Sequence, residues 1–210
     1  MLKTLAMTLV ATGLIASQPA LAADKTSLKI SSPWEIASYE PSVSGFAFYR
    51  LGVMETLVDA SVDGVLEPGL ATEWTMADDG LSWSFTLREG VNFHDGSELT
   101  AEIAANALNL AFAKPSMLQK APISSIVAEQ GKIIIALEKP FSALPALLTH
   151  NTTVIAAPAS LDAEGKHIAA IGTGPFEIDQ FTPPQGLDVK RYEEYWGEDR
   201  PKGSILFYYP

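Results

Sequence analysis

Hydrophobic and polar residues alternate strictly over residues 81–88, and this is the clearest local pattern in the sequence. The apolar positions are Leu81, Trp83, Phe85 and Leu87, and the polar ones are Ser82, Ser84, Thr86 and Arg88. Because successive side chains of an extended chain point to opposite faces, the pattern predicts a half-buried antiparallel strand. Asp-Gly pairs stand at 63–64, 79–80 and 95–96. Since Gly tolerates positive φ and Asp can bond its own backbone, these pairs predict the turns of a β-meander.

Two segments of the chain predict helices. Thr100 is a good N-cap for a helix over residues 101–113, which stops before Pro115. We expect the buried stripe of this helix to consist of Ile103, Ala107, Leu110 and Ala111. Farther upstream, residues 38–45 predict a polar loop, and residues 46–58 predict a helix from an incomplete 3.6-residue period.

Short apolar runs bounded by Pro, Gly or polar residues predict the remaining strands. They lie at residues 28–32, 132–137, 154–157, 176–181, 187–192 and 204–209. The segment Gly172-Thr-Gly-Pro175 predicts a rigid bend. The last run ends directly before Pro210, with no helix after it. Because a strand that needs partners on both sides is a poor terminus for a finished domain, we expect a truncated chain.

Residues 1–22 predict a cleavable secretory signal peptide. Lys3 supplies the positive charge, residues 5–16 form a short apolar run, and Ala20-Leu21-Ala22 fits a small-x-small cleavage site. The run is shorter than the roughly 20 apolar residues that span a membrane. We therefore expect a mature protein that begins at Ala23 and lies in the periplasm. The sequence contains no Cys, which excludes both a lipid anchor on an N-terminal Cys and any disulfide.

Charge and motif searches narrow the function classes. The chain carries a formal net charge of −11, so it should repel nucleic acid and anionic lipid, and no nucleic-acid partner is expected. It has no G-x-S-x-G motif and no Cys nucleophile. His94, His150 and His167 share no metal-ligand spacing. An exported hydrolase would lack its nucleophile or metal set, so we expect no enzyme activity, no catalytic residue, no cofactor and no metal site.

Four ordered blocks of the sequence resemble one known family. The first, residues 70–96, reads L-A-T-E-W-T-M-A-D-D-G-L-S-W-S-F-T-L-R-E-G-V-N-F-H-D-G. The others are Leu99-Thr-Ala-Glu102, Gly172-Thr-Gly-Pro-Phe176 and Tyr192-Glu-Glu-Tyr-Trp-Gly197 followed by Pro201. Together they resemble family 5 of the extracellular solute-binding proteins, the periplasmic receptors of ABC importers for oligopeptides, dipeptides and nickel.

The resemblance implies an α/β fold like that of type II periplasmic binding proteins, with two lobes around a cleft and a small β-rich subdomain inserted into lobe I. It places the first part of lobe I at residues 23–56, the inserted β-rich subdomain at 57–150, and the continuation of lobe I at 151–210. The usual chain of the family is more than twice as long as this one. We therefore expect lobe I to be incomplete and the second lobe to be absent.

The function implied by the resemblance is the capture of an oligopeptide or dipeptide in the periplasm and its delivery to an inner-membrane ABC permease. A ligand that contacts both lobes favours the closed cleft, which then docks on the permease. A monomer is expected. Two alternatives stay open, namely a receptor for nickel or a metal chelate, and a truncated fragment that does not transport. The pair Pro33-Trp34 looks like the nickel branch of the family.

The resemblance also implies which segments reach the ligand. These are the loop after the first strand, the segment after the helix of the inserted subdomain, and the return into lobe I. The residues at these places are Tyr39, Ser42, Ser44, Phe46, Lys114, Met117, His150, Asn151 and Thr152. Receptors of the nickel type carry arginines in the last two segments, and this chain has none there. The difference favours a peptide ligand.

Overall fold

The computed structural model describes residues 27–31, 35–198 and 204–208, and these residues form three β-sheets with helices packed between them. The predicted signal peptide, the Pro33-Trp34 pair and Pro201 lie outside the described residues. The helices are α1 (Pro41–Arg50), α2 (Ala101–Phe112) and the short α3 (Leu144–Leu147), with 3-10 turns at η1 (Met117–Lys120), η2 (Asn151–Thr153) and η3 (Pro158–Ser160).

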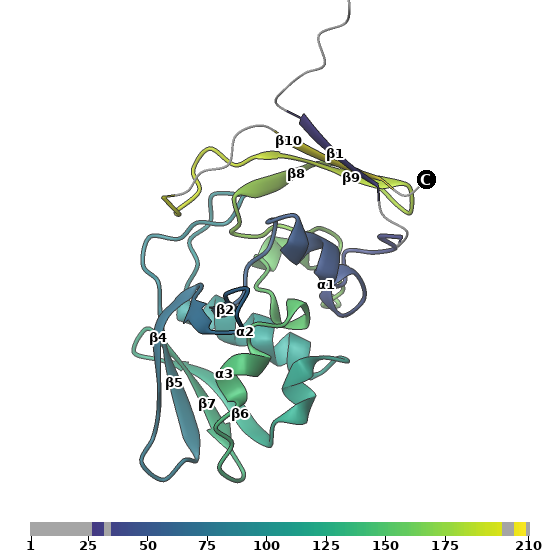
Figure 1. The fold of residues 1–210 in the computed structure, drawn as a ribbon. Coiled ribbons are helices and arrows are strands. Elements are labelled where there is room, and N and C mark those ends of the chain that lie inside the picture. The colour runs from purple at the N-terminus through teal and green to yellow at the C-terminus, as the bar shows by residue number, and fades with distance from the viewer. Residues whose placement is uncertain (1–26, 32–34, 199–203, 209–210) are drawn as a thin grey trace, which may run out of the picture.

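The first sheet joins the two ends of the chain. Its strands, in spatial order, are β1 (Ser27–Ser31), β10 (Ser204–Tyr208), β9 (Gly186–Arg191) and β8 (Phe176–Thr182). β1 pairs in parallel with β10, and the other neighbours are antiparallel. In Figure 1 this sheet lies at the top, with α1 beneath it. The strands predicted at residues 28–32, 176–181, 187–192 and 204–209 are thereby confirmed to within a residue or two.

The second four-stranded sheet contains the alternating segment. Its order is β4 (Ala71–Met76), β5 (Ser82–Leu87), β7 (Lys132–Leu137) and β6 (Ile123–Glu129), all antiparallel. Trp83, Phe85 and Leu87 are buried in β5, as predicted. The prediction for Leu81 is wrong, since 40% of this residue is exposed. Leu81 precedes the strand, and its amide donates to the Asp79 carboxylate at 2.9 Å, so it belongs to the preceding turn.

The three Asp-Gly pairs form the predicted turns, and in each the Gly has positive φ and its amide donates to the carbonyl three residues earlier. They close the β2–β3 hairpin (Val58–Ala60 and Leu66–Pro68), the β4–β5 hairpin and a single bridge between Asn92 and Glu98. The prediction of one meander is wrong. The second neighbour of β5 is β7, which the chain reaches only after α2 and β6.

The helix α1 differs from the prediction. It begins at Pro41, inside the predicted polar loop, and ends at Arg50, whereas the helix was predicted over residues 46–58. The Glu40 side chain caps it by accepting from the amide of Ser42, and Pro at the first helical position has its φ already set for a helix. The serines in the first turn of α1 are polar, and this is why the sequence pattern predicted a loop there. Val58, the last residue of the predicted helix, lies in β2 instead.

The helix α2 matches the predicted bounds to within a residue, with Thr100 as its N-cap. The predicted buried stripe is wrong. The buried residues are Ala101, Ala104, Ala105 and Leu108, whereas the predicted residues Ile103, Ala107, Leu110 and Ala111 are half-buried. Since α2 is apolar on two adjacent faces, the sequence pattern does not distinguish the face that packs on the sheet from the face beside it.

The predicted strand at residues 154–157 is also wrong. Ile155 forms an isolated bridge with Glu55, and the 3-10 turns η2 and η3 lie on either side. The residues Val154, Ile155, Ala156 and Ala157 are nevertheless buried. The apolar run therefore crosses the interior as extended backbone without joining a sheet.

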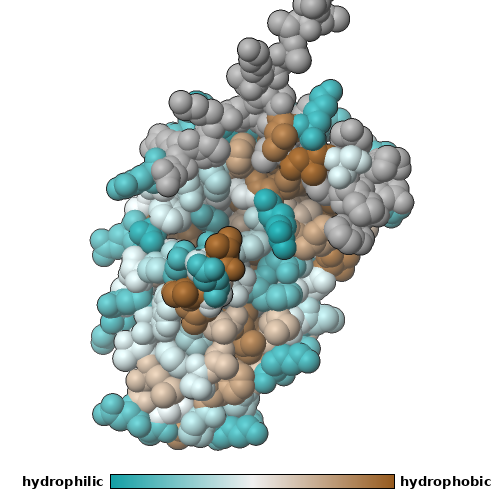
Figure 2. All heavy atoms as spheres, in the orientation of Figure 1, coloured by the Kyte–Doolittle hydropathy of each residue, from teal (hydrophilic) through white to brown (hydrophobic). Residues whose placement is uncertain are grey.

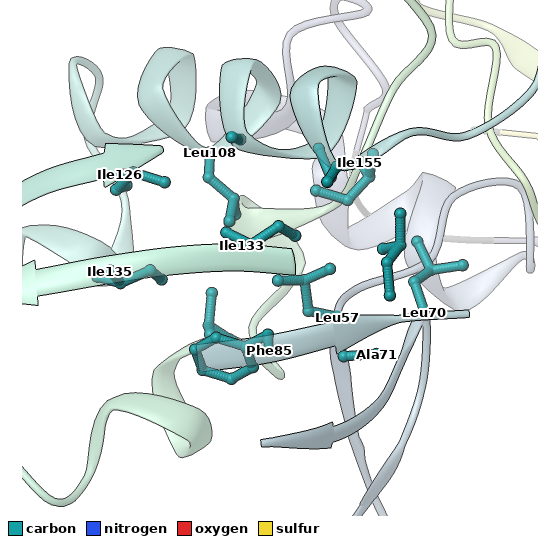
Figure 3. Close-up of a cluster of buried hydrophobic side chains, with 14 of the residues drawn as sticks. Leu57, Leu70, Ala71, Phe85, Leu108, Ile126, Ile133, Ile135 and Ile155 are labelled. Atoms are coloured by element: carbon teal, nitrogen blue, oxygen red, sulfur yellow. The ribbon is translucent and has the colours of Figure 1, made fainter. Parts of the chain in front are cut away.

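Buried apolar side chains form two clusters. The larger lies between α2 and the sheet β4-β5-β7-β6, where Leu108 faces Ile126, Ile133 and Phe85 (Figure 3). The smaller lies between α1 and the upper sheet and includes Phe48 and Leu187. On the face in Figure 2, hydrophilic residues are spread widely and apolar residues form separate patches. The division into lobe I and an inserted subdomain at residues 57–150 stays a prediction.

Candidate functional site

A pocket of about 160 Å³ opens where α1, α2 and the segment after η2 meet. Its lining residues are Glu40, Pro41, Ser42, Ile103, Asn106, Ala107, Leu110, Ala111, Lys114, Thr152, Val154, Ala156, Pro158, Leu161 and His167. They come from four parts of the sequence. We call this hollow the α1–α2 pocket.

One wall of the α1–α2 pocket is the second apolar face of α2. Ile103, Ala107 and Ala111 follow one another at intervals of four residues, so they stand in a row along the helix, with Leu110 beside them. Opposite this row lie Val154 and Ala156, which are buried. Because Ala side chains are short, they leave space between the helix and the opposite segment. The half-buried residues of α2 therefore form an apolar floor of the pocket, and Ile103, Ala107 and Ala111 also pack against the larger apolar cluster.

The other end of the pocket carries charge. The ammonium of Lys114 donates to Oε2 of Glu40, and the amide of Ser42 donates to Oε1 at 3.5 Å. Burial raises the pKa of Glu40, but the hydrogen bond from Lys114, the nearby His167 ring and the positive charge of Lys114 outweigh this effect, so the pKa lies below its ordinary value. Glu40 is therefore ionised at neutral pH, with Lys114 as its partner.

His167 lies beside this ion pair. Only 7% of its side chain is exposed, and its Nδ1 is 3.3 Å from Oε2 of Glu40. The geometry gives Nδ1 no hydrogen bond. Burial lowers the pKa of His167, and Glu40 opposes this effect only in part. The imidazole is therefore neutral at pH 7, and it brings a buried nitrogen without a hydrogen-bond partner to the pocket.

Three of the residues predicted to bind ligand line this pocket, namely Ser42, Lys114 and Thr152. Tyr39 instead borders a second hollow together with His94 and Asp95. Its ring packs edge-on against Phe181, with 4.6 Å between the ring centroids.

The other five predicted residues hold the surrounding segments. The buried hydroxyl of Ser44 accepts from the amide of Ser38, and half-buried Phe46 packs against the smaller apolar cluster. The amide of Met117 donates to the Thr152 hydroxyl at 3.2 Å.

His150 and Asn151 fix the turn η2. Nδ1 of His150 accepts from the amide of Thr152 at 3.2 Å, which caps the turn. The carbonyl oxygen of Asn151 lies against Gly45 of α1, so close that a Cβ on Gly45 would be 2.4 Å away. These two residues thereby position Thr152 at the pocket without lining it themselves. The role of all nine predicted residues in ligand binding stays a prediction.

Sequence reasoning missed Glu40, His167 and the apolar floor. The floor had a usable signal, because Ile103, Ala107 and Ala111 were recognised as a stripe but assigned to the core. Glu40 directly precedes Pro41, which is a helix-start signal. His167 lies in an irregular segment, and no local pattern in the sequence connects it to Glu40.

The structure describes residues 27–31, 35–198 and 204–208. Within these ranges, no group of three or more His, Asp or Glu side chains could hold a metal ion. No helix within them is long and apolar enough to cross a membrane.

Comparison with known families gives a match over most of the chain. The model described as "Bacterial extracellular solute-binding proteins, family 5 Middle" matches residues 65–205. Among curated proteins, the glutathione-binding protein GsiB of Salmonella typhi is 30% identical over 209 residues, which covers 93% of this chain and 40% of GsiB. The chain thus spans about two fifths of the length of these curated relatives.

Comparison with solved structures also finds binding proteins of ABC transporters. A nickel ABC transporter protein from Bacillus halodurans superimposes with a TM-score of 0.78 at 28% identity, covering 89% of this chain and 39% of that one. The periplasmic binding protein DppA of Helicobacter pylori, solved with the peptide STSA, has a TM-score of 0.75 at 22% identity, covering 88% and 42%. At that identity the second likeness concerns the fold alone.

Proposed function

The chain belongs to family 5 of the bacterial extracellular solute-binding proteins, and from this premise we propose that it captures a small peptide in the periplasm for an inner-membrane ABC permease. The family is the one that the four sequence blocks were found to resemble, and the fold is that of type II periplasmic binding proteins. The relatives are named as binding proteins rather than enzymes. The peptide ligand, the delivery to a permease and the periplasmic location all belong to the proposal.

The α1–α2 pocket is the observation that carries the proposal. It combines an apolar floor with a polar end that contains Glu40, Lys114 and His167. Small-molecule sites are typically concave and mostly apolar, with a few polar groups that orient the ligand. A peptide matches this division, because it carries charged or hydrogen-bonding groups next to side chains of varied polarity.

The names of relatives support a peptide over a metal chelate. Glutathione, which gives GsiB its name, is a tripeptide, and GsiB matches nearly the whole of this chain. The nickel transporter protein of Bacillus halodurans supports the alternative ligand. A bare metal ion fits the pocket poorly, because the described part of the pocket supplies one carboxylate and one imidazole, fewer than the three ligands typical of a protein metal site. A metal chelate brings its own ligands, so it remains the alternative.

In the proposed mechanism the ligand acts as a bridge. This chain contributes one wall of the cleft, formed by α1, α2 and the segment after η2. A ligand that also contacts the opposite lobe favours the closed state by the difference between its affinities for the closed and open states. The closed form then docks on the permease, and no covalent bond is made or broken.

Calorimetry and NMR titration of the purified chain test the proposal with three probes, namely glutathione, the dipeptide Ala-Leu and a nickel–histidine complex. We expect at least one peptide to bind and to shift amide resonances along α2. The variant Ala107→Phe should abolish binding by filling the pocket, whereas Ala113→Phe, on an exposed position just past α2, should not. Binding of the nickel complex alone would establish the alternative, and binding of no probe would support a non-transporting fragment.

A further inference from the structure

The ion pair at the end of the α1–α2 pocket restricts the charge of a ligand. Glu40 and Lys114 are both partly accessible, with 22% and 30% of their side chains exposed. Together they are neutral, and His167 beside them is neutral as well. The apolar floor of α2 begins directly next to these three residues. A ligand head group therefore meets one positive and one negative charge at the edge of an apolar surface.

A ligand with a single charge fits this end poorly. An ammonium would meet Glu40 but would also repel Lys114, and a carboxylate would meet Lys114 but repel Glu40. Either one would leave an unbalanced charge at the edge of an apolar pocket, which is costly. A zwitterionic head gives every charge an opposite neighbour and keeps the pocket neutral.

The buried nitrogen of His167 adds an independent observation. Nδ1 has no hydrogen-bond partner, although it lies 3.3 Å from Oε2 of Glu40. Buried polar groups in folded proteins are almost always hydrogen-bonded, so such an atom calls for a partner. A ligand ammonium carries three N–H donors. One ammonium could therefore donate to the Glu40 carboxylate and to the neutral His167 ring together.

We propose that the α1–α2 pocket binds the free α-amino acid head of its ligand, with the ammonium on Glu40 and His167 and the carboxylate on Lys114. The aliphatic part then lies on Ala107 and Ala111. This inference rests on the proposed function and narrows its ligand class. An ordinary peptide has its ammonium and carboxylate at opposite ends. The ligand is instead a free amino acid or a peptide whose first residue is linked through its side chain.

Two isomeric dipeptides separate this inference from the proposed function. γ-Glutamyl-alanine has a free α-amino acid head, and α-glutamyl-alanine has the same composition and net charge without one. In NMR titrations of the ¹⁵N-labelled chain, we expect the γ isomer to bind at least tenfold more tightly and to shift the ring-nitrogen resonances of His167. Equal affinities for the two isomers would overturn the inference and leave peptide binding intact. If neither isomer binds, the inference is overturned, and the binding of Ala-Leu then decides whether the proposed function stands.

Charge variants locate the head group. Glu40→Gln and Lys114→Met should each remove the preference for the γ isomer, because each removes one of the two opposite charges. About tenfold is expected from one charge-assisted contact. The exposed neighbours Glu138 and Lys139 provide matched controls outside the pocket, and Glu138→Gln and Lys139→Met should keep the preference. If circular dichroism shows Glu40→Gln to be unfolded, the preference of Lys114→Met for the γ isomer is the test of the inference. A γ preference that persists in Lys114→Met overturns the inference.

Discussion

Oε2 of Glu55 accepts a hydrogen bond from the indole Nε1 of Trp196 at 2.9 Å, which ties the segment before β2 to the segment after β9. The same oxygen accepts from the Thr173 hydroxyl at 2.7 Å, and Oε1 accepts from the Tyr195 hydroxyl at 3.0 Å. Burial raises the pKa of Glu55, and the three donors oppose this effect only in part. One carboxylate thus joins three segments that are far apart in the sequence.

Replacing Glu55 should destabilise the fold in proportion to the hydrogen bonds that are lost. Glu55→Ala leaves the donors of Trp196 and Thr173 without an acceptor, so we expect the free energy of unfolding to fall by about 2–4 kcal/mol. Glu55→Gln keeps an oxygen for both donors and can donate its amide to the Tyr195 oxygen, and it should lose less than half as much. Urea denaturation at pH 7 measures both. Equal losses in the two variants would mean that the negative charge of the carboxylate, rather than its acceptor oxygens, accounts for the effect.

The raised pKa of Glu55 also predicts a pH dependence. A carboxyl whose pKa is higher in the folded state holds its proton more tightly there. Its contribution to stability is complete below the ordinary value of 4.5 and declines as the pH rises through the raised pKa. Because Glu55→Gln does not titrate, its stability relative to the parent chain should improve between pH 4 and pH 8. A difference that stays constant over this range contradicts the prediction.

His94 should produce the opposite trend. Its Nε2 donates to the carbonyl of Gly174 at 3.0 Å and its Nδ1 accepts from the amide of Gly172 at 3.3 Å, an arrangement that only the neutral ring allows. Burial lowers the pKa of His94 below the ordinary 6.5. The unfolded chain therefore takes up a proton first, and stability present above about pH 6.5 is lost as the pH falls.

The variant His94→Phe tests this trend. It should cost about 1–3 kcal/mol at pH 7.5, since the amide of Gly172 and the carbonyl of Gly174 lose their partner. It should also weaken the loss of stability between pH 7 and pH 5. Tyr192→Phe is the matched control, because it removes the hydrogen bond to the Phe93 carbonyl but leaves His94 in place. An unchanged pH slope in His94→Phe would assign the slope to other groups.

The local elements of this fold were largely predictable from the sequence, and the reason is physical. Strict alternation specifies β5, because only one face of that strand is buried. Thr100 specifies the start of α2, because its hydroxyl accepts from the amide of Ile103. Each signal lies within a few residues of the element that it predicts, so no knowledge of distant contacts is needed.

Pairing and burial were less predictable, because they depend on distant contacts. β1 pairs with β10, and no sequence pattern in either strand predicts this pairing. α2 has two adjacent apolar faces, and only the packing of α2 on the sheet determines which of them is fully buried. The pocket residues Glu40 and His167 are far apart in sequence, and Glu40 lies at the start of α1, which begins earlier than predicted. The resemblance to the family located three of the lining residues but not these two.

A close contact between Gly45 and the backbone of Asn151 holds α1 against η2 beside the pocket. Gly45 lies inside α1, and a Cβ there would be 2.4 Å from the carbonyl oxygen of Asn151. Helix propensity alone predicts that Gly45→Ala stabilises the chain by about 1 kcal/mol. We expect a loss of about 1–3 kcal/mol instead, because the backbone of η2 must move, as in other overpacked sites. Thermal or urea unfolding measures the change. Val43→Ala, on an exposed position of the same helix, gains propensity without a clash and should leave stability unchanged or raise it. Stabilisation by Gly45→Ala would show that α1 and η2 are not in close contact.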